Sequence, residues 1–378
     1  NKVTLPITSR FEPKVNKAST PLYEYNFEVC SKTGRIFTEY LSTNPIIEYK
    51  YNWLTCFEPE NHLDELNKII FEEYHLKKDL VIYGYSFKDD TLLERIKKVS
   101  FKKKLNFRIK SSLELGLPVK GACLNELINF TNKTNIQNIA EENGKCDILI
   151  MRHVIEHFWD LEKKLQAIKY LLKDNGKIIF EVPDSEYGFK NKLSTIIWEE
   201  HFSYFTINSL KTTLISNSFK INNSLRYKNK LEDSLVIFSS PCEKISLPKK
   251  ESSSIFKENK KILERFFNDI YEKKIILNKF FESIKSNKIL LFGAGHHAST
   301  FVNFNQCERF IDFVIDDNIH KQNKLLSGTR LMIVKKNILK NFDNPHIFLT
   351  TNPENYLPIK EMILELNPSS KVFSIFSI

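Results

Sequence analysis

The chain has 378 residues, of which 42% are hydrophobic and 27% are charged. This is the composition of a globular protein, so a disordered, collagen-like or disulfide-scaffold chain is excluded, and the length predicts two or three domains. Lys and Arg outnumber Asp and Glu by 56 to 46, a formal net charge of +10. That excess indicates an anionic partner, which could be nucleic acid, a membrane or a phosphorylated small molecule.

Several features narrow the choice of compartment and partner. The six cysteines show no C-x-x-C spacing, the lysines are dispersed and form no basic stripe, and no apolar run approaches the roughly 20 residues that span a bilayer. The start of the chain lacks a signal-peptide pattern. We therefore expect a reduced, cytoplasmic protein that binds neither nucleic acid nor membrane, which leaves a phosphorylated small molecule. The oligomeric state is left open.

The first 70 residues are predicted to be irregular, with short aromatic-rich segments. From about residue 78 to 240, strands alternate with helices, which predicts an α/β fold with a mostly parallel, helix-covered sheet. The strands are expected at 80–83, 105–109, 146–151 and 177–182, and the helices at 91–98 and 161–172, the second ending at Asn175-Gly176.

A Ser-, Pro- and Lys-rich stretch after residue 241 leads into a long helix, expected from about 254 to 284, that connects two domains. A second, smaller α/β unit follows. Its strands are expected at 288–292, 310–315, 331–334, 346–349 and 371–374. The predicted division is thus a small lobe (1–70), a middle domain (71–245) and a connector helix with a C-terminal domain (246–378).

The strongest functional pattern lies after the strand at 146–151. Arg152-His153-Val-Ile-Glu156-His157 follows it directly, and ligands bind at the carboxyl ends of strands in parallel sheets. The spacing H-x-x-E-H is also that of inverted zincins, but a zincin needs a purely helical context and here a strand precedes it.

A second cluster reads Ile197-Trp198-Glu199-Glu200-His201-Phe-Ser-Tyr204. A glutamate next to a histidine can tune the histidine towards a neutral pKa, which suits a general base. The alternative is a helix end with incidental charges.

Together, "HVIEHFWDLEKKLQAIKYLLKDNGKIIFEVPD" and "IIWEEHFSYFT" resemble the sugar C-methyltransferases, enzymes that use S-adenosylmethionine to methylate nucleotide-linked keto-deoxysugars. The resemblance extends more weakly to Gly293-Ala-Gly295 and to the stretch 311–329. It implies a class I methyltransferase-like Rossmann core, a small N-terminal lobe of zinc-binding type and a C-terminal Rossmann-like domain.

The resemblance also implies roles. Methylation beside a ketone needs removal of an α-proton and stabilisation of the enolate. His201 would be the base, Glu200 would orient it, and His157 would polarise or reprotonate the substrate. Trp198 and Glu199 replace a Tyr and a His of the family pattern.

The cofactor end departs from the family. The loop after the first strand keeps one glycine, Gly84, and no acid ends the second strand. The residues expected to contact S-adenosylmethionine are Gly84, Ser86, Asp90, Arg152 and His153.

The N-terminal lobe keeps one thiol, Cys30, of the two cysteine pairs that the family uses for zinc, so we expect no zinc and no other metal. The remaining substrate-contacting candidates come from the lobe, the second cluster and the C-terminal domain. They are Tyr49, Tyr51, Trp198, Tyr204, Gly293, Gly295, His296 and Lys321.

Three hypotheses remain. The first is an S-adenosylmethionine-dependent C-methyltransferase acting on a nucleotide-linked sugar. The second is an enzyme that keeps His157 and His201 but has lost the methyl donor, and that epimerises, isomerises or dehydrates a keto sugar. The third is a non-catalytic relative that binds a sugar nucleotide or a protein partner.

Overall fold

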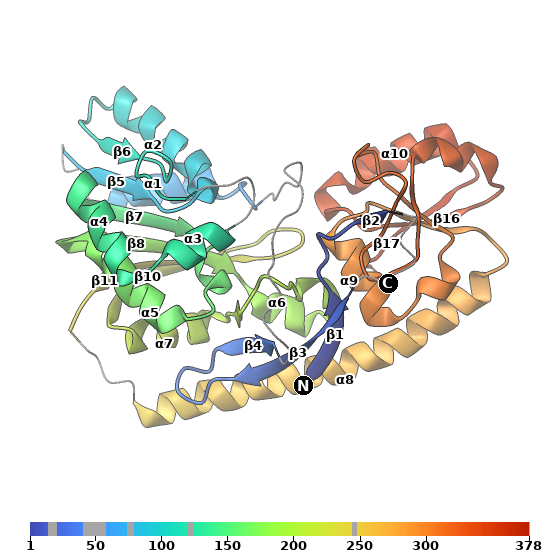
Figure 1. Ribbon diagram of the computed structural model, residues 1–378, viewed down its shortest axis with the longest axis horizontal. Coiled ribbons are helices and arrows are strands. Elements are labelled where there is room, and N and C mark those ends of the chain that lie inside the picture. The colour runs from blue at the N-terminus through green and yellow to red at the C-terminus, as the bar shows by residue number, and fades with distance from the viewer. Residues whose placement is uncertain (14–20, 41–57, 74–78, 119–123, 244–247, 378) are drawn as a thin grey trace.

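The fold consists of three main β-sheets tied together by one long helix (Figure 1). The computed structural model describes residues 1–13, 21–40, 58–73, 79–118, 124–243 and 248–377. Within these ranges no helix is both long and apolar enough to cross a membrane. The division into domains at residues 70 and 245 stays a prediction.

The middle sheet is mixed, with strand order β10-β11-β8-β7-β5-β6. The four strands β5 to β8 run parallel, β11 is antiparallel to β8, and β10 is antiparallel to β11. The strands are β5 (Val81–Gly84), β6 (Arg108–Lys110), β7 (Cys146–Arg152), β8 (Leu172–Pro183), β10 (Phe219–Tyr227) and β11 (Ser234–Pro241).

Helices cover both faces of this sheet, and each face has its own hydrophobic core. One face packs against α1 (Leu63–Glu73) and α2 (Asp90–Lys102). The other packs against α3 (Asn125–Phe130), α4 (Lys133–Asn143), α5 (Leu161–Ile168) and α7 (Ile207–Ser216). The doubly wound arrangement with a parallel centre is the class I Rossmann-like core that the sequence predicts.

The N-terminal segment forms a sheet, so the prediction of an irregular region is wrong for its described residues. The antiparallel order is β1-β3-β4-β9. The strands are β1 (Lys2–Pro6), β3 (Leu22–Val29), β4 (Ile36–Tyr40) and β9 (Ser203–Tyr204). The last of these belongs to the second motif, so the N-terminal sheet is bound directly to the segment that carries His201.

The C-terminal sheet is parallel, with order β15-β13-β12-β16-β17. Its strands are β12 (Ile289–Phe292), β13 (Phe313–Ile315), β15 (Ile333–Val334), β16 (His346–Leu349) and β17 (Lys371–Ser374). The helices α9 (His296–Asn305) and α10 (Tyr356–Leu366) belong to this unit, and the short pair β2 (Glu12–Pro13) and β14 (Lys324–Leu325) ties it to the N-terminal segment.

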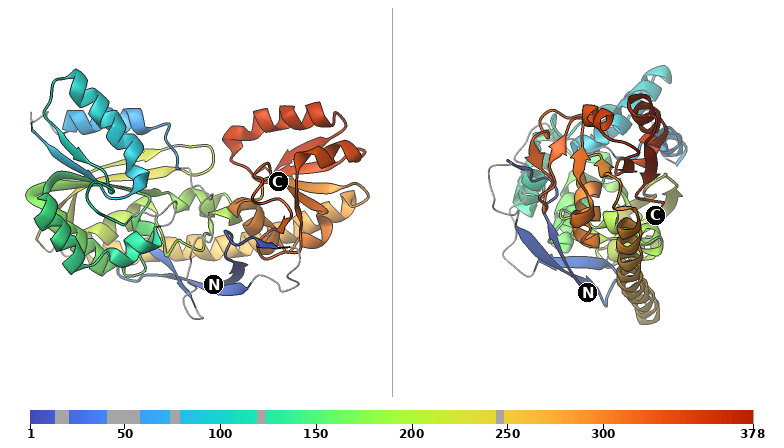
Figure 2. Two further views of the ribbon diagram at one scale, coloured as in Figure 1. Left: turned by 45° about the horizontal axis from the view of Figure 1, so that its top comes forward. Right: turned by 90° about the vertical axis from the view of Figure 1, so that its right-hand side faces the viewer.

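The helix α8 (Lys249–Ile284) runs along the molecule beside the N-terminal strands, as Figures 1 and 2 show. Its buried side chains form one stripe, which packs first against the N-terminal sheet and then against the C-terminal sheet. The predicted connector helix is therefore present and begins five residues earlier than expected.

Short elements complete the chain. The remaining α-helix is α6 (Ser185–Lys190). The 3-10 turns are η1 (Phe87–Asp89), η2 (Ile155–His157), η3 (Lys169–Leu171), η4 (Ser194–Ile196), η5 (Glu308–Phe310), η6 (Lys336–Asn341) and η7 (Pro353–Asn355). The helix predicted over 161–172 ends at Ile168, because Leu172 already pairs with Cys146 in the β7–β8 ladder.

Candidate active site

The candidate site lies at the carboxyl ends of β5, β7 and β8, where ligands of parallel sheets bind. Strand β7 ends at Arg152, and His153 follows it with a left-handed φ of 50°. A non-glycine residue in that region is strained, and here a bond from the His153 N–H to the Glu181 carbonyl, 2.8 Å long, helps to hold it. The turn places the His153 side chain among carboxylates.

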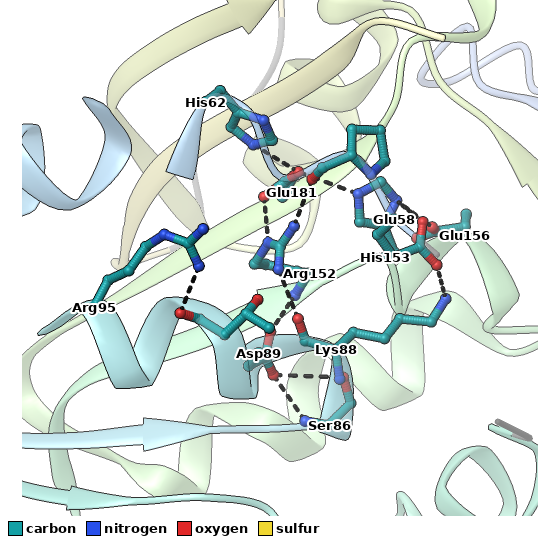
Figure 3. Close-up of polar contacts among 12 residues, drawn as sticks. Glu58, His62, Ser86, Lys88, Asp89, Arg95, Arg152, His153, Glu156 and Glu181 are labelled. Atoms are coloured by element: carbon teal, nitrogen blue, oxygen red, sulfur yellow. Dashed lines mark hydrogen bonds and ion pairs between the residues drawn. The ribbon is translucent and has the colours of Figure 1, made fainter. Parts of the chain in front are cut away.

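Glu181 is the centre of a buried charge network (Figure 3). Arg152 and Glu181 are both 0% exposed, and the Arg152 Nε donates to Glu181 Oε2 over 2.7 Å. The second oxygen of Glu181 lies 3.1 Å from His153 Nε2 and 3.0 Å from His62 Nε2. The charges of Arg152 and Glu181 can be buried because each has a partner of opposite charge.

The network fixes protonation states. Burial would raise the pKa of Glu181, but Arg152 and the two histidines hold it well below its usual range. Burial likewise opposes protonation of His153, yet the neighbouring carboxylates of Glu58, Glu156 and Glu181 raise its pKa to about 10. His153 is therefore an imidazolium at neutral pH.

The backbone N–H groups of the loop after β5 are hydrogen-bonded to a side chain of the same loop, Asp89. Asp89 is fully buried, and its Oδ2 accepts the N–H groups of Tyr85 and Ser86, both over 2.8 Å. Its Oδ1 accepts the N–H of Arg152, also over 2.8 Å. A Cβ on Gly84 would lie 2.7 Å from the Leu93 side chain, so this glycine allows α2 to pack closely on the strand.

The two histidines of the sequence motifs do come together. His157 lies on η2, and its ring centroid is 4.7 Å from that of His201 at an interplanar angle of 88°. The Glu200 carboxylate lies 3.8 Å from His157 Nδ1. One donor atom each from Glu156, His157 and His201 lie within 4.8 Å of one another. We call Glu156, His157, Glu200 and His201 the histidine cluster.

The electrostatics of the cluster keep both rings neutral at neutral pH. Burial, and then the positive charges of Lys88 and of the other histidines, lowers the pKa of His157 well below its usual value. Burial also lowers the pKa of His201 to about 4, although Glu156 acts in the opposite direction. Each ring therefore has a nitrogen that can accept a proton. That Glu200 orients His201 stays a prediction, since the ion pair described here joins Glu200 to His157.

Trp198 links the histidine cluster to the C-terminal unit. Its ring stacks on His296 at 4.3 Å and lies 5.7 Å from His201. His296 is bonded at both ring nitrogens, Nε2 to the Thr195 carbonyl at 2.9 Å and Nδ1 to Thr8 Oγ1 at 3.1 Å. We call this arrangement the Trp198–His296 contact. The contact joins the middle domain, which carries Trp198, to the C-terminal unit, which carries His296 on α9. A substrate role for His296 stays a prediction.

The other substrate candidates in the C-terminal unit have structural partners. Gly293 has a φ of 107°, and a Cβ there would lie 2.7 Å from Thr351. Gly295 is the N-cap of α9. Lys321 Nζ is paired with Asp316 Oδ2 at 3.0 Å, and the same oxygen accepts the Ala294 N–H over 2.7 Å.

The remaining candidates fall in different places. Tyr204 is buried, and its hydroxyl bonds to the Trp198 backbone at 3.2 Å. Asp90, the first residue of α2, is partly buried, and burial raises its pKa. Tyr49 and Tyr51 lie outside the described residues.

Sequence reasoning missed several members of the site: Glu58, His62, Lys88, Asp89 and Glu181. It placed Glu156 at the site as part of the first motif but gave it no role. Glu181 lies within the first quoted motif, near the end of β8, so its position could have singled it out. Lys88 lies in the recognised loop after the first strand, whereas Glu58, with which it forms an ion pair of 2.7 Å, lies in a stretch with no recognisable pattern.

The sequence of residues 28–221, more than half of the chain, matches the family described as "Methyltransferase domain". The chain belongs to this methyltransferase family. Residues 243–353 match a second family, described as "C-methyltransferase C-terminal domain". The expected class of S-adenosylmethionine-dependent methyltransferase is thus confirmed at the level of the family, and S-adenosylmethionine is the cofactor of that class.

Individual relatives cover less of the methyltransferase chain. The "C-methyltransferase NovU" of Streptomyces niveus is 29% identical over 105 residues, which are 28% of this chain and 25% of NovU. The chain thus matches about a quarter of the length of that relative. Among solved structures, the 1,6-didemethyltoxoflavin-N1-methyltransferase of Burkholderia thailandensis has a TM-score of 0.30 at 14% identity, covering 49% of this chain and 80% of its own. The CurJ carbon methyltransferase has a TM-score of 0.33 at 10% identity, covering 48% of this chain and 54% of its own.

The described residues of the methyltransferase do not fit the usual contacts of the methyl donor. The loop amides after β5 already donate to Asp89. In place of an acid for the ribose hydroxyls, β6 ends at Lys110, whose Nζ donates to Asn143 Oδ1 over 2.9 Å. Glu114, four residues further on, accepts the N–H and hydroxyl of Ser111. Donor binding by this chain therefore departs from the usual pattern.

Proposed function

We propose that the protein transfers a methyl group to a carbon of a nucleotide-linked keto-deoxysugar, and that the histidine cluster generates the enolate. The observation that carries the proposal is the pairing of His157 and His201 beside Glu156 and Glu200. The match of residues 243–353 to a C-methyltransferase C-terminal domain supports carbon as the acceptor. The sugar class rests on the resemblance of the two histidine motifs.

In this mechanism His201 is the base. Its ring nitrogen takes the proton from the carbon beside the ketone, the C–H bond breaks, and the electron pair moves into the enolate. His157 donates a hydrogen bond to the enolate oxygen, where negative charge develops. S-adenosylmethionine, when bound, supplies an electrophilic methyl group.

A second candidate function keeps the acid–base chemistry without the methyl donor. The specific observation in its favour is the loop after β5, where Asp89 occupies the amides of Tyr85 and Ser86. Enolate formation followed by reprotonation would then epimerise or isomerise the keto sugar.

One experiment tests the base, and a second separates the candidates. Nucleotide-linked 4-keto-6-deoxyglucose, incubated with the protein in deuterium oxide, should exchange the proton beside its ketone. His201→Ala should slow this exchange by about 10²–10⁴-fold, the usual contribution of a general base. His346→Ala, which changes a buried histidine on β16 far along the chain, is the matched control and should exchange at the wild-type rate.

Unchanged exchange in His201→Ala would show that the base is assigned wrongly. Calorimetric titration with S-adenosylhomocysteine then separates the candidates. Binding together with a methylated product supports the transferase, whereas exchange with no binding at millimolar ligand supports the donor-free enzyme.

A further inference from the structure

The carboxylate of Glu156 has an unusual environment. It is 1% exposed, and neither of its oxygens has a hydrogen-bond partner among the residues that the structure describes. The nearest basic atoms are His153 Nδ1 at 3.6 Å and His157 Nε2 at 4.0 Å, both beyond hydrogen-bond range. The His153 imidazolium offsets part of the negative charge, but a buried carboxylate without hydrogen bonds is still costly, which favours a further ligand bound beside it.

The side chains around Glu156 are those of a metal site. One donor atom from each of Glu156, His157 and His201 lies within 4.8 Å of the other two. Within the described part of the chain, His157 Nε2 also has no hydrogen-bond partner. Two imidazoles and one carboxylate form a set that Zn²⁺, Co²⁺ and Mn²⁺ accept. Because zinc–nitrogen distances are about 2.0–2.1 Å, each of the three ligand atoms would have to move towards the bound ion by about 1 Å.

A second layer of contacts supports the same reading. Glu200 Oε2 lies 3.8 Å from His157 Nδ1, on the opposite edge of the ring from Nε2. A carboxylate that accepts a hydrogen bond from the far ring nitrogen is the usual outer partner of a metal-bound imidazole, because it orients the ring and makes it more basic. Glu200 stands on the correct side of the ring and would have to approach by about 0.5 Å to accept that bond. The nearby cation Lys88 is paired with Glu58 at 2.7 Å, which offsets its repulsion of a metal ion.

We propose that Glu156, His157 and His201 bind a divalent transition-metal cation of the zinc class. This departs from the sequence expectation of no metal, and it also differs from the inverted-zincin pattern. That pattern would use His153, whose Nε2 instead faces Glu181 Oε1 at 3.1 Å.

The proposed metal has a functional consequence. A cation bound to His201 takes the nitrogen lone pair that proton abstraction needs, so metal binding and base catalysis by His201 exclude each other. The metal-loaded protein is therefore inhibited in the exchange reaction. This consequence rests on the proposed function, whereas the metal site itself does not.

The test uses the full chain, stripped with a chelator and desalted, and Co²⁺ as the probe. One equivalent of Co²⁺ should give visible d–d absorption, and Zn²⁺ should abolish it by displacement. Glu156→Gln, which keeps the shape of the side chain, should weaken Co²⁺ binding at least about 100-fold, more than the 10–100-fold typical of an outer-shell change.

Glu199→Gln is the matched control. Glu199 is a buried carboxylate two residues before His201, and its Oε1 accepts the Thr8 N–H and hydroxyl. This variant should keep the Co²⁺ spectrum. Absence of stoichiometric Co²⁺ binding, wild-type affinity in Glu156→Gln, or equal loss in both variants would overturn the site. Lack of proton exchange by the metal-free wild type would instead contradict the proposed function and leave the metal site standing.

Discussion

Glu181→Gln tests the buried charge network most directly. The substitution keeps the size of the side chain and removes one negative charge from a residue that is 0% exposed. The Arg152 guanidinium, 2.7 Å away, then loses an attraction of about 6 kcal/mol at an effective dielectric of 20. Because Arg152 keeps its bonds to the Lys88 and Pro59 carbonyls, part of that loss is recovered. We expect the free energy of unfolding to fall by about 3–5 kcal/mol, the usual result of removing one partner of a buried pair.

Urea unfolding followed by circular dichroism measures this loss. The matched control is Glu24→Gln, which breaks the surface pair with Lys2 at 2.8 Å, where the two side chains are 60% and 42% exposed. A surface pair contributes at most about 1 kcal/mol. Equal effects of the two substitutions would mean that the buried charges of the network stabilise the fold no more than a surface ion pair does.

Three further changes have defined outcomes. The pKa of His153 rises from 6.5 to about 10 on folding, so its contribution to stability is complete below pH 6.5 and is lost as pH rises towards 10. The pH dependence of urea unfolding should therefore be flatter over this window in His153→Asn, by up to about 1.4 kcal/mol per pH unit. Gly34→Ala should lower the free energy of unfolding by about 1–3 kcal/mol, because φ is 71° and the new Cβ would lie 2.5 Å from the Ile255 side chain; a wild-type urea midpoint would contradict this. His296→Ala should lower the free energy of unfolding by about 2 kcal/mol, because the stacking on Trp198 and two hydrogen bonds are lost. A decrease of less than about 0.5 kcal/mol would show that the Trp198–His296 contact does not stabilise the fold.

The parts of the fold that the sequence predicts well are those with local signals. The strands at 346–349 and 371–374 have the bounds expected, and the apolar run after Cys146 is β7. The runs of β7 and β16 are buried almost throughout, because both faces of a parallel sheet are covered.

The errors in the predicted fold arise where pairing with a distant segment determines the secondary structure. The N-terminal strands look irregular in sequence because their sheet is completed by β9, whose Ser203 pairs with Phe37. The helix over 161–172 is cut short because the ladder partner of Leu172 is Cys146.

The same reasoning applies to the site. The two histidine motifs identify His157 and His201, whose rings do meet. The carboxylates around His153 come from positions far from it in the sequence: Glu58 precedes α1, and Glu181 lies on β8. No spacing rule links such positions, since only the packed chain brings them within reach of His153.

Because both the N-terminal and the C-terminal sheet pack on the stripe of buried residues of α8, this helix sets the angle between the two sheets. Asn259 donates to the Gly34 carbonyl over 2.7 Å at one end, and Phe281 is buried in the C-terminal core at the other. Each residue of an α-helix adds a rise of 1.5 Å and a rotation of about 100°. One residue inserted near the exposed Ile276 would therefore turn the C-terminal sheet by about 100° about the helix axis, whereas four would turn it by only about 40°. The length of α8 between its two docking sites thus determines whether the Trp198–His296 contact can form, and insertions there should be tolerated in steps of a helical turn.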